Sequence, residues 1–310
     1  MGETCRVRVL LLVNSSASSV TARSRVVIQK ALSADHDVTM AETNRRGHAT
    51  RLAKGAVADG VDVVVVLGGD GTLNEAANGL AGSDTALAAL PGGSTNVFAR
   101  TIGLPDDPVE ATGALIEALA ARSIRRVGLG SVNGRYFLFH VGLGFDAAVV
   151  QQVERRASWK RYASHALFVF AAFDTAIRHY DRSRPRLAMR FPDGSIVDDV
   201  YQGAVFNSNP YTYIGPLPFN FAPDASLDRP FATVAIRTLN MATILGLFGS
   251  ALRTGARIRR HPKVDYRVDV ASVVATGFGP FPYQVDGDYL GEASELTFVY
   301  EPDALALVIP

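Results

Sequence analysis

Residues 7–121 repeat one pattern, in which a short apolar run is followed by a segment with helical spacing. The run over 61–67 is the clearest case, because it is almost wholly apolar and ends at a glycine-rich turn. A strand that is apolar throughout is buried on both faces, as in a parallel sheet covered by helices on both sides. This part of the sequence therefore predicts a three-layer α/β/α domain with a parallel sheet. Strands are expected over 7–13, 38–41, 61–67 and 86–90, and helices over 20–32, 48–58, 72–80 and 109–121.

The pattern changes near Arg125, after which short strands dominate. Pro192-Asp193-Gly194 separates two of them and is typical of a hairpin turn. We expect a β-sandwich-like second domain with helical insertions at about 147–180 and 241–258. The fold class is thus α/β plus all-β, with domains over 1–125 and 126–300 and with 301–310 packing back on the first. The remaining strands are expected over 126–131, 135–141, 187–191, 196–200, 203–206, 233–237, 264–270, 273–276 and 296–300.

Composition excludes several classes of protein. Hydrophobic residues make up 48% of the 310 residues, which excludes wholesale disorder. The net charge of +1 gives no general basic field for a nucleic acid partner. The single cysteine, Cys5, excludes a disulfide scaffold and a cysteine zinc site, and it fits an intracellular compartment. The longest apolar stretches, 166–173 and 241–252, are shorter than the ~20 residues of a membrane-spanning helix.

The strongest candidate for chemistry is the segment GGDGTLNE, which begins at Gly68 and opens a predicted helix. Glycines allow an anion to approach the backbone, and N–H groups at a helix start point towards it. The segment is not a P-loop, because the chain contains no Gly-Lys pair. Asp70 would repel a phosphate unless a metal lies between them. The structural alternative is a tight strand-to-helix turn, and we favour phosphate binding.

A second glycine turn, PGGSTNVFAR, starts at Pro91 and follows the next strand. Neighbouring strands of a parallel sheet place both turns along one edge, where α/β proteins bind ligands. Ser94 is not a hydrolase nucleophile, since Asn96 stands where the final glycine of that motif belongs. The later segment 142–147 matches a relaxed dinucleotide fingerprint, but it lies in the β-rich part and is interpreted as a tight turn between layers.

Acidic and basic clusters remain. Asp286-Gly287 on its own is typical of a hairpin turn, and Asp224 and Asp228 also fit a turn. The six histidines lack the spacing of a metal site. Two apolar segments carry basic residues at one end, which is typical of contact with a membrane surface, although a buried helix with a solvated end is the alternative. The residues are Arg155, Arg156, Trp159, Lys160 and Arg161 before 166–173, and Arg253, Arg257, Arg259, Arg260 and Lys263 after 241–252.

Taken in order, these motifs resemble the soluble bacterial diacylglycerol kinase-like lipid kinases, a family that includes sphingosine and ceramide kinases. The resemblance covers nearly the whole chain. It rests on the Asn14 turn, the two glycine segments and Asp286-Gly287-Asp288. The wider superfamily also holds NAD kinases and phosphofructokinases, but the continuation Leu73-Asn74-Glu75 and the PGGSTNVFAR turn favour the lipid branch.

The resemblance implies that ATP and Mg²⁺ are bound in a cleft between two domains and that a carboxylate takes the proton of a lipid hydroxyl. The family's glutamate base corresponds to Asp288, whose side chain is one methylene shorter. Asp70 is the rival base and Glu292 a more remote one. The residues implied to line the nucleotide site are Asn14, Thr43, Gly68, Gly69, Asp70, Gly71, Thr72, Asn74, Glu75, Gly93, Ser94, Thr95 and Asn96. A metal is implied at Asp70, with Asp224 and Asp228 as an accessory site. The chain departs from the family at Val97, which replaces an acid, and at Arg229-Pro230, which weakens that accessory site.

The expected activity is ATP-dependent phosphorylation of diacylglycerol to phosphatidate at the cytoplasmic face of the membrane. Trp159, Lys160, Arg253, Arg257, Arg259 and Arg260 are the expected membrane contacts. One alternative is a kinase for a sphingoid base, a glycolipid or NAD. Another is a nucleotide-binding regulator without catalysis. The sequence leaves open whether the chain forms a homodimer.

Overall fold

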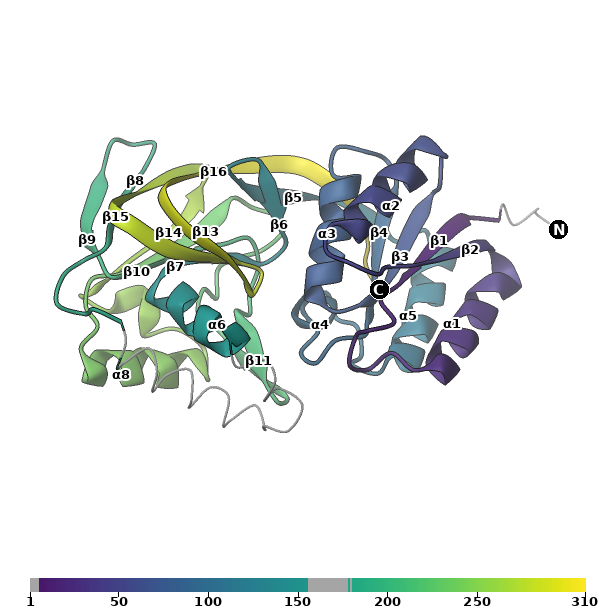
Figure 1. Cartoon of the computed structure of the whole chain (residues 1–310), viewed down its shortest axis with the longest axis horizontal. Coiled ribbons are helices and arrows are strands. Elements are labelled where there is room, and N and C mark those ends of the chain that lie inside the picture. The colour runs from purple at the N-terminus through teal and green to yellow at the C-terminus, as the bar shows by residue number, and fades with distance from the viewer. Residues whose placement is uncertain (1–5, 156–177, 179) are drawn as a thin grey trace. The chain divides into compact units, whose positions relative to one another are not determined.

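The computed structural model describes residues 6–155, 178 and 180–310 (Figure 1). These form two compact units, of which unit 1 runs to Leu129 and adds Glu301–Pro310, and unit 2 is Gly130–Tyr300. Strands β5 (Ile124–Val132) and β16 (Asp288–Val308) belong partly to each unit.

Unit 1 is a parallel sheet with helices on both faces. Its strand order is β2, β1, β3, β4 and the end of β16, where Leu307 pairs with Leu87. Helices α1 and α5 pack together on one face, and α2 and α3 pack together on the other (Figure 1). The α/β/α prediction is therefore confirmed. The elements are β1 (Arg8–Val13), α1 (Ala22–Asp35), β2 (Asp37–Glu42), α2 (His48–Ala58), β3 (Val63–Gly68), α3 (Asp70–Leu80), β4 (Ala86–Pro91), α4 (Val97–Thr101) and α5 (Pro108–Ala120).

Burial explains why this unit could be predicted. All six residues of β3 and of β4 are buried, as expected for central strands between two helical layers. Helix α3 begins at Asp70, two residues before the expected start, because Gly69 is the N-cap and the two residues after it already adopt helical geometry.

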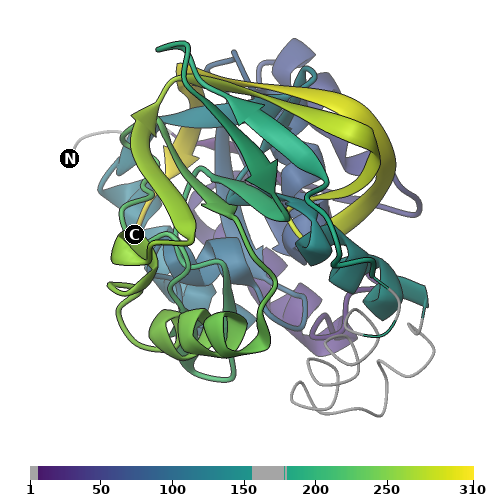
Figure 2. The same cartoon turned by 90° about the vertical axis from the view of Figure 1, so that its left-hand side faces the viewer.

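Unit 2 is rich in strands and contains a curled antiparallel sheet, in the order β14, β13, β10, β7, β15 and β16. Strand β15 pairs with β8 through its first part and with β7 through its last, with an irregularity between Thr276 and Phe281. Figure 2 views this unit from another side, with α8 in light green below its strands. The remaining elements are β6 (Arg135–Phe137), β7 (His140–Gly144), α6 (Phe145–Arg155), β8 (Leu187–Arg190), β9 (Ile196–Val200), β10 (Gln202–Phe206), β11 (Thr212–Ile214), β12 (Leu217–Phe219), β13 (Phe231–Ile236), α8 (Met241–Ala251), η2 (Ile258–Arg260), β14 (Val264–Val270) and β15 (Ser272–Val285).

One apolar core fills the curled sheet, with fully buried Phe137, Phe231, Phe281 and Phe298. A second core lies under α8 and includes Phe206 and Leu247. The β-rich prediction with helical insertions is confirmed. The expected helix over 241–258 is shorter, because α8 ends at Ala251. Most of the insertion over 147–180 lies outside the described residues, of which α6 is the beginning.

Two local expectations in unit 2 are wrong. The predicted strand 135–141 is divided into β6 and β7, because Leu138 and Phe139 donate their N–H groups to the Asp286 carboxylate instead of to a strand. The segment around Gly142–Asp146 is no separate turn, since β7 runs to Gly144 and α6 starts at Phe145. Gly144 makes this direct junction with φ of +75°.

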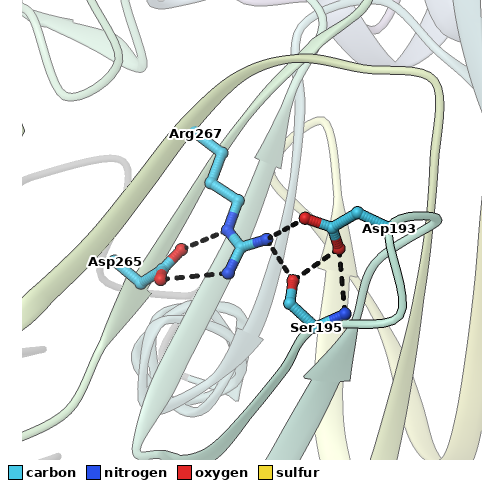
Figure 3. A network of polar contacts seen from close by, with 4 residues as sticks. All are labelled: Asp193, Ser195, Asp265 and Arg267. Atoms are coloured by element: carbon cyan, nitrogen blue, oxygen red, sulfur yellow. Dashed lines mark hydrogen bonds and ion pairs between the residues drawn. The ribbon is translucent and has the colours of Figure 1, made fainter.

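A polar network joins the β8–β9 turn to β14 on the surface of unit 2 (Figure 3). The Arg267 guanidinium donates to Asp265 at 2.7 Å and to the Ser195 hydroxyl at 2.5 Å, and it forms an ion pair with Asp193 at 3.6 Å. The same guanidinium lies 3.7 Å from the centre of the Phe191 ring. Arg267 thus combines ion pairing with a cation–π contact.

Candidate active site

The residues expected at the nucleotide site of unit 1 gather at one edge of its sheet. Asn14 follows β1, Thr43 follows β2, Gly69 follows β3 and Gly92 follows β4. Because these strands are parallel, their carboxyl ends meet at the same edge, which is where open α/β sheets bind ligands.

The N-terminus of α3 lies at this edge. Its N-cap is Gly69, which has no side chain that could cap the helix. The nearby Thr72 hydroxyl accepts a hydrogen bond of 2.9 Å from the Asn14 amide, which connects the ends of β1 and β3. The start of a helix presents backbone N–H groups and the positive end of the helix dipole, and both favour an anion such as phosphate.

The two glycine turns pack directly on each other. A Cβ atom at Gly92 would lie 2.8 Å from the backbone nitrogen of Gly68, and one at Gly93 would lie 2.8 Å from the Cα of Gly69. Side chains at Gly92 and Gly93 are therefore excluded by contact between the turns. This requirement exists whether or not a ligand is bound.

Asp70 connects the same two turns through its carboxylate. Its two oxygens accept the N–H groups of Val97 at 2.9 Å and Phe98 at 3.0 Å, at the start of α4. Asp70 thus supplies the acceptor that the unpaired N–H groups of that short helix require. This contact gives the aspartate a structural partner in the second turn, in addition to the metal-binding and base roles that the sequence suggested.

The other motif residues have local partners too. Glu75 accepts the N–H groups of Gly47 at 2.7 Å and Ala49 at 3.2 Å, and so caps α2. Asn96 is left-handed, with φ of +50°, and its side-chain oxygen accepts the Gly93 N–H at 2.7 Å. Asn74 is buried, whereas Ser94 is exposed. Of these residues, Ser94 and the half-buried Thr95 are therefore the better placed to reach a solute.

Asp286-Gly287 forms the expected two-residue hairpin turn between β15 and β16, since Val285 pairs with Asp288. Both turn residues have positive φ, +49° and +82°, as a type I′ turn requires. Asp286 does more than turn the chain, because its buried carboxylate accepts the N–H groups of Leu138 at 2.7 Å, Phe139 at 3.0 Å and His140 at 3.1 Å.

Asp288, the expected base, is half-buried at the start of β16. In the described part of the chain no hydrogen bond or ion pair involves its side chain. Its carboxylate is therefore available to a substrate, in contrast to that of Asp286. Glu292, the remote alternative, is exposed further along the same strand.

A cluster that the sequence did not reveal lies next to this hairpin. Asp146, at the start of α6, accepts hydrogen bonds from the Tyr211 hydroxyl at 2.5 Å and the Gln284 amide at 2.9 Å. Burial raises the pKa of the Asp146 carboxyl, and these two hydrogen bonds partly offset the effect. A Cβ at Gly142 would lie 1.6 Å from the Asp146 carboxylate, so the glycine of the rejected fingerprint makes room for this aspartate.

His140 lies beside the cluster, with its ring 4.1 Å from the ring of Tyr211. The side chain is buried, and neither ring nitrogen has a hydrogen-bond partner among the described residues. Burial lowers the pKa of the His140 imidazole to about 3, so the ring is neutral at pH 7. Burial and the neighbouring Asp146 raise the pKa of the Tyr211 hydroxyl.

The proposed accessory metal residues have protein partners. The Asp224 carboxylate contacts the Arg259 guanidinium at 2.8 Å and accepts the Tyr266 hydroxyl at 2.8 Å. The described residues contain no group of three or more His, Cys, Asp or Glu side chains placed to bind a metal. An arginine-paired carboxylate is a poor donor for a cation, so Asp224 does not suit a resident metal.

Of the expected membrane contacts, the structure describes the four arginines that follow α8. Arg253, Arg257 and Arg260 are exposed after α8, as is Arg259, which forms the ion pair with Asp224. Trp159 and Lys160 lie outside the described residues. Among the helices that can be described, none has the length and hydropathy to cross a membrane.

Comparisons with known proteins agree with this arrangement. Residues 8–132 match the diacylglycerol kinase catalytic domain. The diacylglycerol kinase of Staphylococcus carnosus (strain TM300) is 29% identical over 277 residues, which cover 86% of this chain and 83% of that protein. The diacylglycerol kinase of Bacillus subtilis (strain 168) is 39% identical over 121 residues, 38% of this chain and 39% of that one.

The fold is shared with solved structures. A crystal structure of a diacylglycerol kinase from Bacillus anthracis str. Sterne has a TM-score of 0.72 at 20% identity. The match covers 98% of this chain and 97% of the other. A likeness at this identity supports the fold alone.

Proposed function

We propose that the chain transfers the γ-phosphate of ATP to a lipid hydroxyl, with diacylglycerol as acceptor and phosphatidate as product. The match of residues 8–132 to the diacylglycerol kinase catalytic domain and the similarity to curated diacylglycerol kinases support this proposal. The observation that carries this proposal is the glycine-rich start of α3, which lies where four parallel strands end. Backbone N–H groups there are suited to the phosphates of a nucleotide.

In the proposed reaction the acceptor hydroxyl oxygen attacks the γ-phosphorus. The bond from that phosphorus to the bridging oxygen breaks, and ADP leaves with the electron pair. Asp288 accepts the hydroxyl proton. Its carboxylate suits this role because, within the described residues, it has no competing partner, whereas both oxygens of Asp70 accept backbone N–H groups. Mg²⁺ enters as part of the Mg·ATP substrate and neutralises phosphate charge.

Transfer of labelled γ-phosphate tests the activity. The purified chain is given Mg·ATP and diacylglycerol in mixed micelles, with a sphingoid base, a glycolipid and NAD in parallel reactions. We expect labelled phosphatidate, and we expect Asp288→Asn to lower kcat by about 10³-fold because the general base is lost. Glu292→Gln is the matched control, since this exposed carboxylate lies on the same strand and should keep full activity.

Each other outcome has a definite meaning. Label on NAD or on another lipid alone would reject diacylglycerol as the acceptor. Binding of ATP by calorimetry without transfer to any acceptor would reject catalysis and leave a nucleotide-binding regulator. Full activity of Asp288→Asn would reject the assignment of the base.

We also propose that α8 and the loop after it contact an anionic membrane at the inner face of the cell membrane. Leu245 on α8 is 57% exposed, and Arg253, Arg257 and Arg260 follow it. An exposed apolar side chain next to several arginines suits the interface of acidic lipids. Arg259 should contribute less, because Asp224 already neutralises it.

Sedimentation with vesicles that contain phosphatidylglycerol tests this surface. Leu245→Asp should reduce the bound fraction several-fold. Leu217→Asp is the control, because Leu217 is 53% exposed on β12 and lies outside the segment from α8 to Arg260. Equal loss in both variants, or no loss in either, would reject α8 as the contact.

A further inference from the structure

Asp288 lies between two residues whose backbone groups are held by side-chain contacts that lead to α6. Gly287 precedes it and Tyr289 follows it, and each donates its N–H to a side chain. The Asp288 carboxylate itself has no such contact among the described residues. Its position therefore depends on its two neighbours.

The contact on the Gly287 side runs through a buried chain of hydrogen bonds. The Gly287 N–H donates to the Gln284 side-chain oxygen at 2.8 Å. The Gln284 amide nitrogen then donates to Asp146 at 2.9 Å. Gln284 is fully buried, so its amide has a fixed orientation, with the oxygen towards Gly287 and the nitrogen towards Asp146. The first turn of α6 thus reaches the residue before Asp288.

The contact on the Tyr289 side comes from the end of the same helix. The Glu154 carboxylate accepts the Tyr289 N–H at 3.0 Å. The Gln151 amide donates to the Tyr289 hydroxyl at 3.0 Å. Because Gln151 and Glu154 are three residues apart, they lie on one face of α6. The backbone N–H and the side-chain hydroxyl of Tyr289 are therefore both held by this face.

We propose that α6 positions the Asp288 carboxylate, with Glu154 as the positioning residue on the Tyr289 side. This inference rests on the proposed role of Asp288 as the base. An aspartate has one fewer rotatable bond than a glutamate, so an error in its backbone position is not corrected by its side chain. A displacement of about 1 Å can lower a rate 100-fold, which makes the position of Tyr289 important for the reaction.

The test compares Glu154→Ala and Glu154→Gln in the labelled transfer assay, with full kinetics for ATP and lipid. Glu154→Ala should lower kcat by roughly 10- to 100-fold and leave the KM for ATP unchanged. Glu154→Gln should stay within about threefold of the parent, because its amide oxygen can still accept the Tyr289 N–H. Gln152→Ala is the matched control, since Gln152 is next to the contact residues on α6 but its side chain has no hydrogen bond in the described structure.

A second variant separates positioning from proton transfer. In an Asp288→Glu background the longer side chain can compensate for a loose backbone, so Glu154→Ala should cost at least threefold less there than in the parent. If Glu154 were itself the base, Glu154→Gln would be as inactive as Glu154→Ala. That result would overturn the inference.

The two proposals fail in different ways. If the parent has no transfer activity, or if Asp288→Asn is fully active, the proposed function or its base is wrong. If Asp288→Asn is inactive but Glu154→Ala matches the parent, the base stands and the positioning role is wrong. Thermal unfolding of each variant is measured alongside, and an unchanged midpoint with lowered kcat supports positioning over general stability.

Discussion

Two Asp-Gly pairs in this chain can be compared directly, Asp70-Gly71 in unit 1 and Asp286-Gly287 in unit 2. In both, the carboxylate accepts backbone N–H groups from another segment. Asp70 is half-buried and accepts two such groups at the start of α4. Asp286 is 6% exposed and accepts three N–H groups, whose residues are separated from it by 146 to 148 positions in the sequence. The same dipeptide thus opens a helix in one unit and a hairpin in the other, and in both it organises a neighbouring loop.

The comparison shows that an aspartate in a glycine turn need not face a ligand. The number and burial of the N–H groups it accepts set the cost of removing it, since a buried donor without an acceptor costs roughly 1–3 kcal/mol. Asp286 should therefore matter more for stability than Asp70. Asp288, two residues later and without such contacts, should matter more for chemistry than for stability.

The largest effect is expected for Asp286→Gly. Glycine accepts the φ of +49° without strain, so the substitution removes only the carboxylate and its three hydrogen bonds. We expect the free energy of unfolding to fall by roughly 3–5 kcal/mol, measured by urea denaturation.

Asp303→Gly is the matched control for that substitution. Asp303 also has a positive φ, +51°, but its side chain is exposed. Its replacement by glycine therefore raises the entropy of the unfolded chain by the same amount without removing buried contacts. Equal destabilisation of the two variants would mean that the Asp286 carboxylate contributes nothing beyond the turn.

A smaller effect is expected for Asp70→Ala. The N–H groups of Val97 and Phe98 lose their acceptor, and both residues are buried, which should lower the free energy of unfolding by roughly 2–3 kcal/mol. Denaturation of Glu117→Ala, an exposed site on α5, gives the baseline. A cost for Asp70→Ala above that for Asp286→Gly would reverse the ranking and contradict the burial argument.

The next largest effect is expected for the loss of stability in acid. It should come from His140, which lies in the segment whose N–H groups Asp286 accepts. The pKa of His140 is about 3 in the folded chain against 6.5 when unfolded, so the unfolded chain binds a proton first as the pH falls. Stability from the neutral ring is complete above pH 6.5 and is lost towards pH 3. This loss is about 2 kcal/mol at pH 5 relative to pH 7.

Comparison with His140→Phe isolates this effect, since phenylalanine keeps the ring contacts without the proton. The variant should lose less stability than the parent between pH 7 and pH 5. Asp146 has the opposite sign, because its raised pKa adds stability at low pH that is lost as the pH rises. If both proteins follow the same pH curve, the histidine is not buried as a neutral ring.

How far the sequence could predict the structure also differs between the units. The parallel sheet of unit 1 was predictable because β3 and β4 are apolar throughout and buried on both faces. Each is also followed directly in the sequence by glycines and then by a helix. The gathering of Asn14, Thr43 and the glycine turns follows from that topology. In unit 2 the break between β6 and β7 was not predictable, since the acceptor that causes it is Asp286, far along the chain.

The candidate site was also only partly predictable, because its contacts join residues that are far apart in the sequence. Asp288 was identified through the resemblance, but the contacts on either side of it join residues 135 and 138 positions apart. No local pattern marks Gln284 or Glu154 as its supports. The one signal was Gly142, whose missing side chain makes room for Asp146 four residues later.

The smallest effect is expected for the partly solvated network of Figure 3, which completes the comparison with Asp286 and Asp70. Arg267→Lys keeps the charge but loses the two-pronged contact with Asp265 and the planar stack on Phe191. Because the Arg267 and Asp265 side chains are partly solvated, the free energy of unfolding should fall by about 1 kcal/mol or less, and less still in 1 M salt. Arg237→Lys is the control, because Arg237 forms an ion pair with Asp199 and stacks on no aromatic ring in the described structure. A loss at Arg267 as large as that at Asp70 would show that exposure does not govern the ranking, and the burial argument for both Asp-Gly pairs would then need another basis.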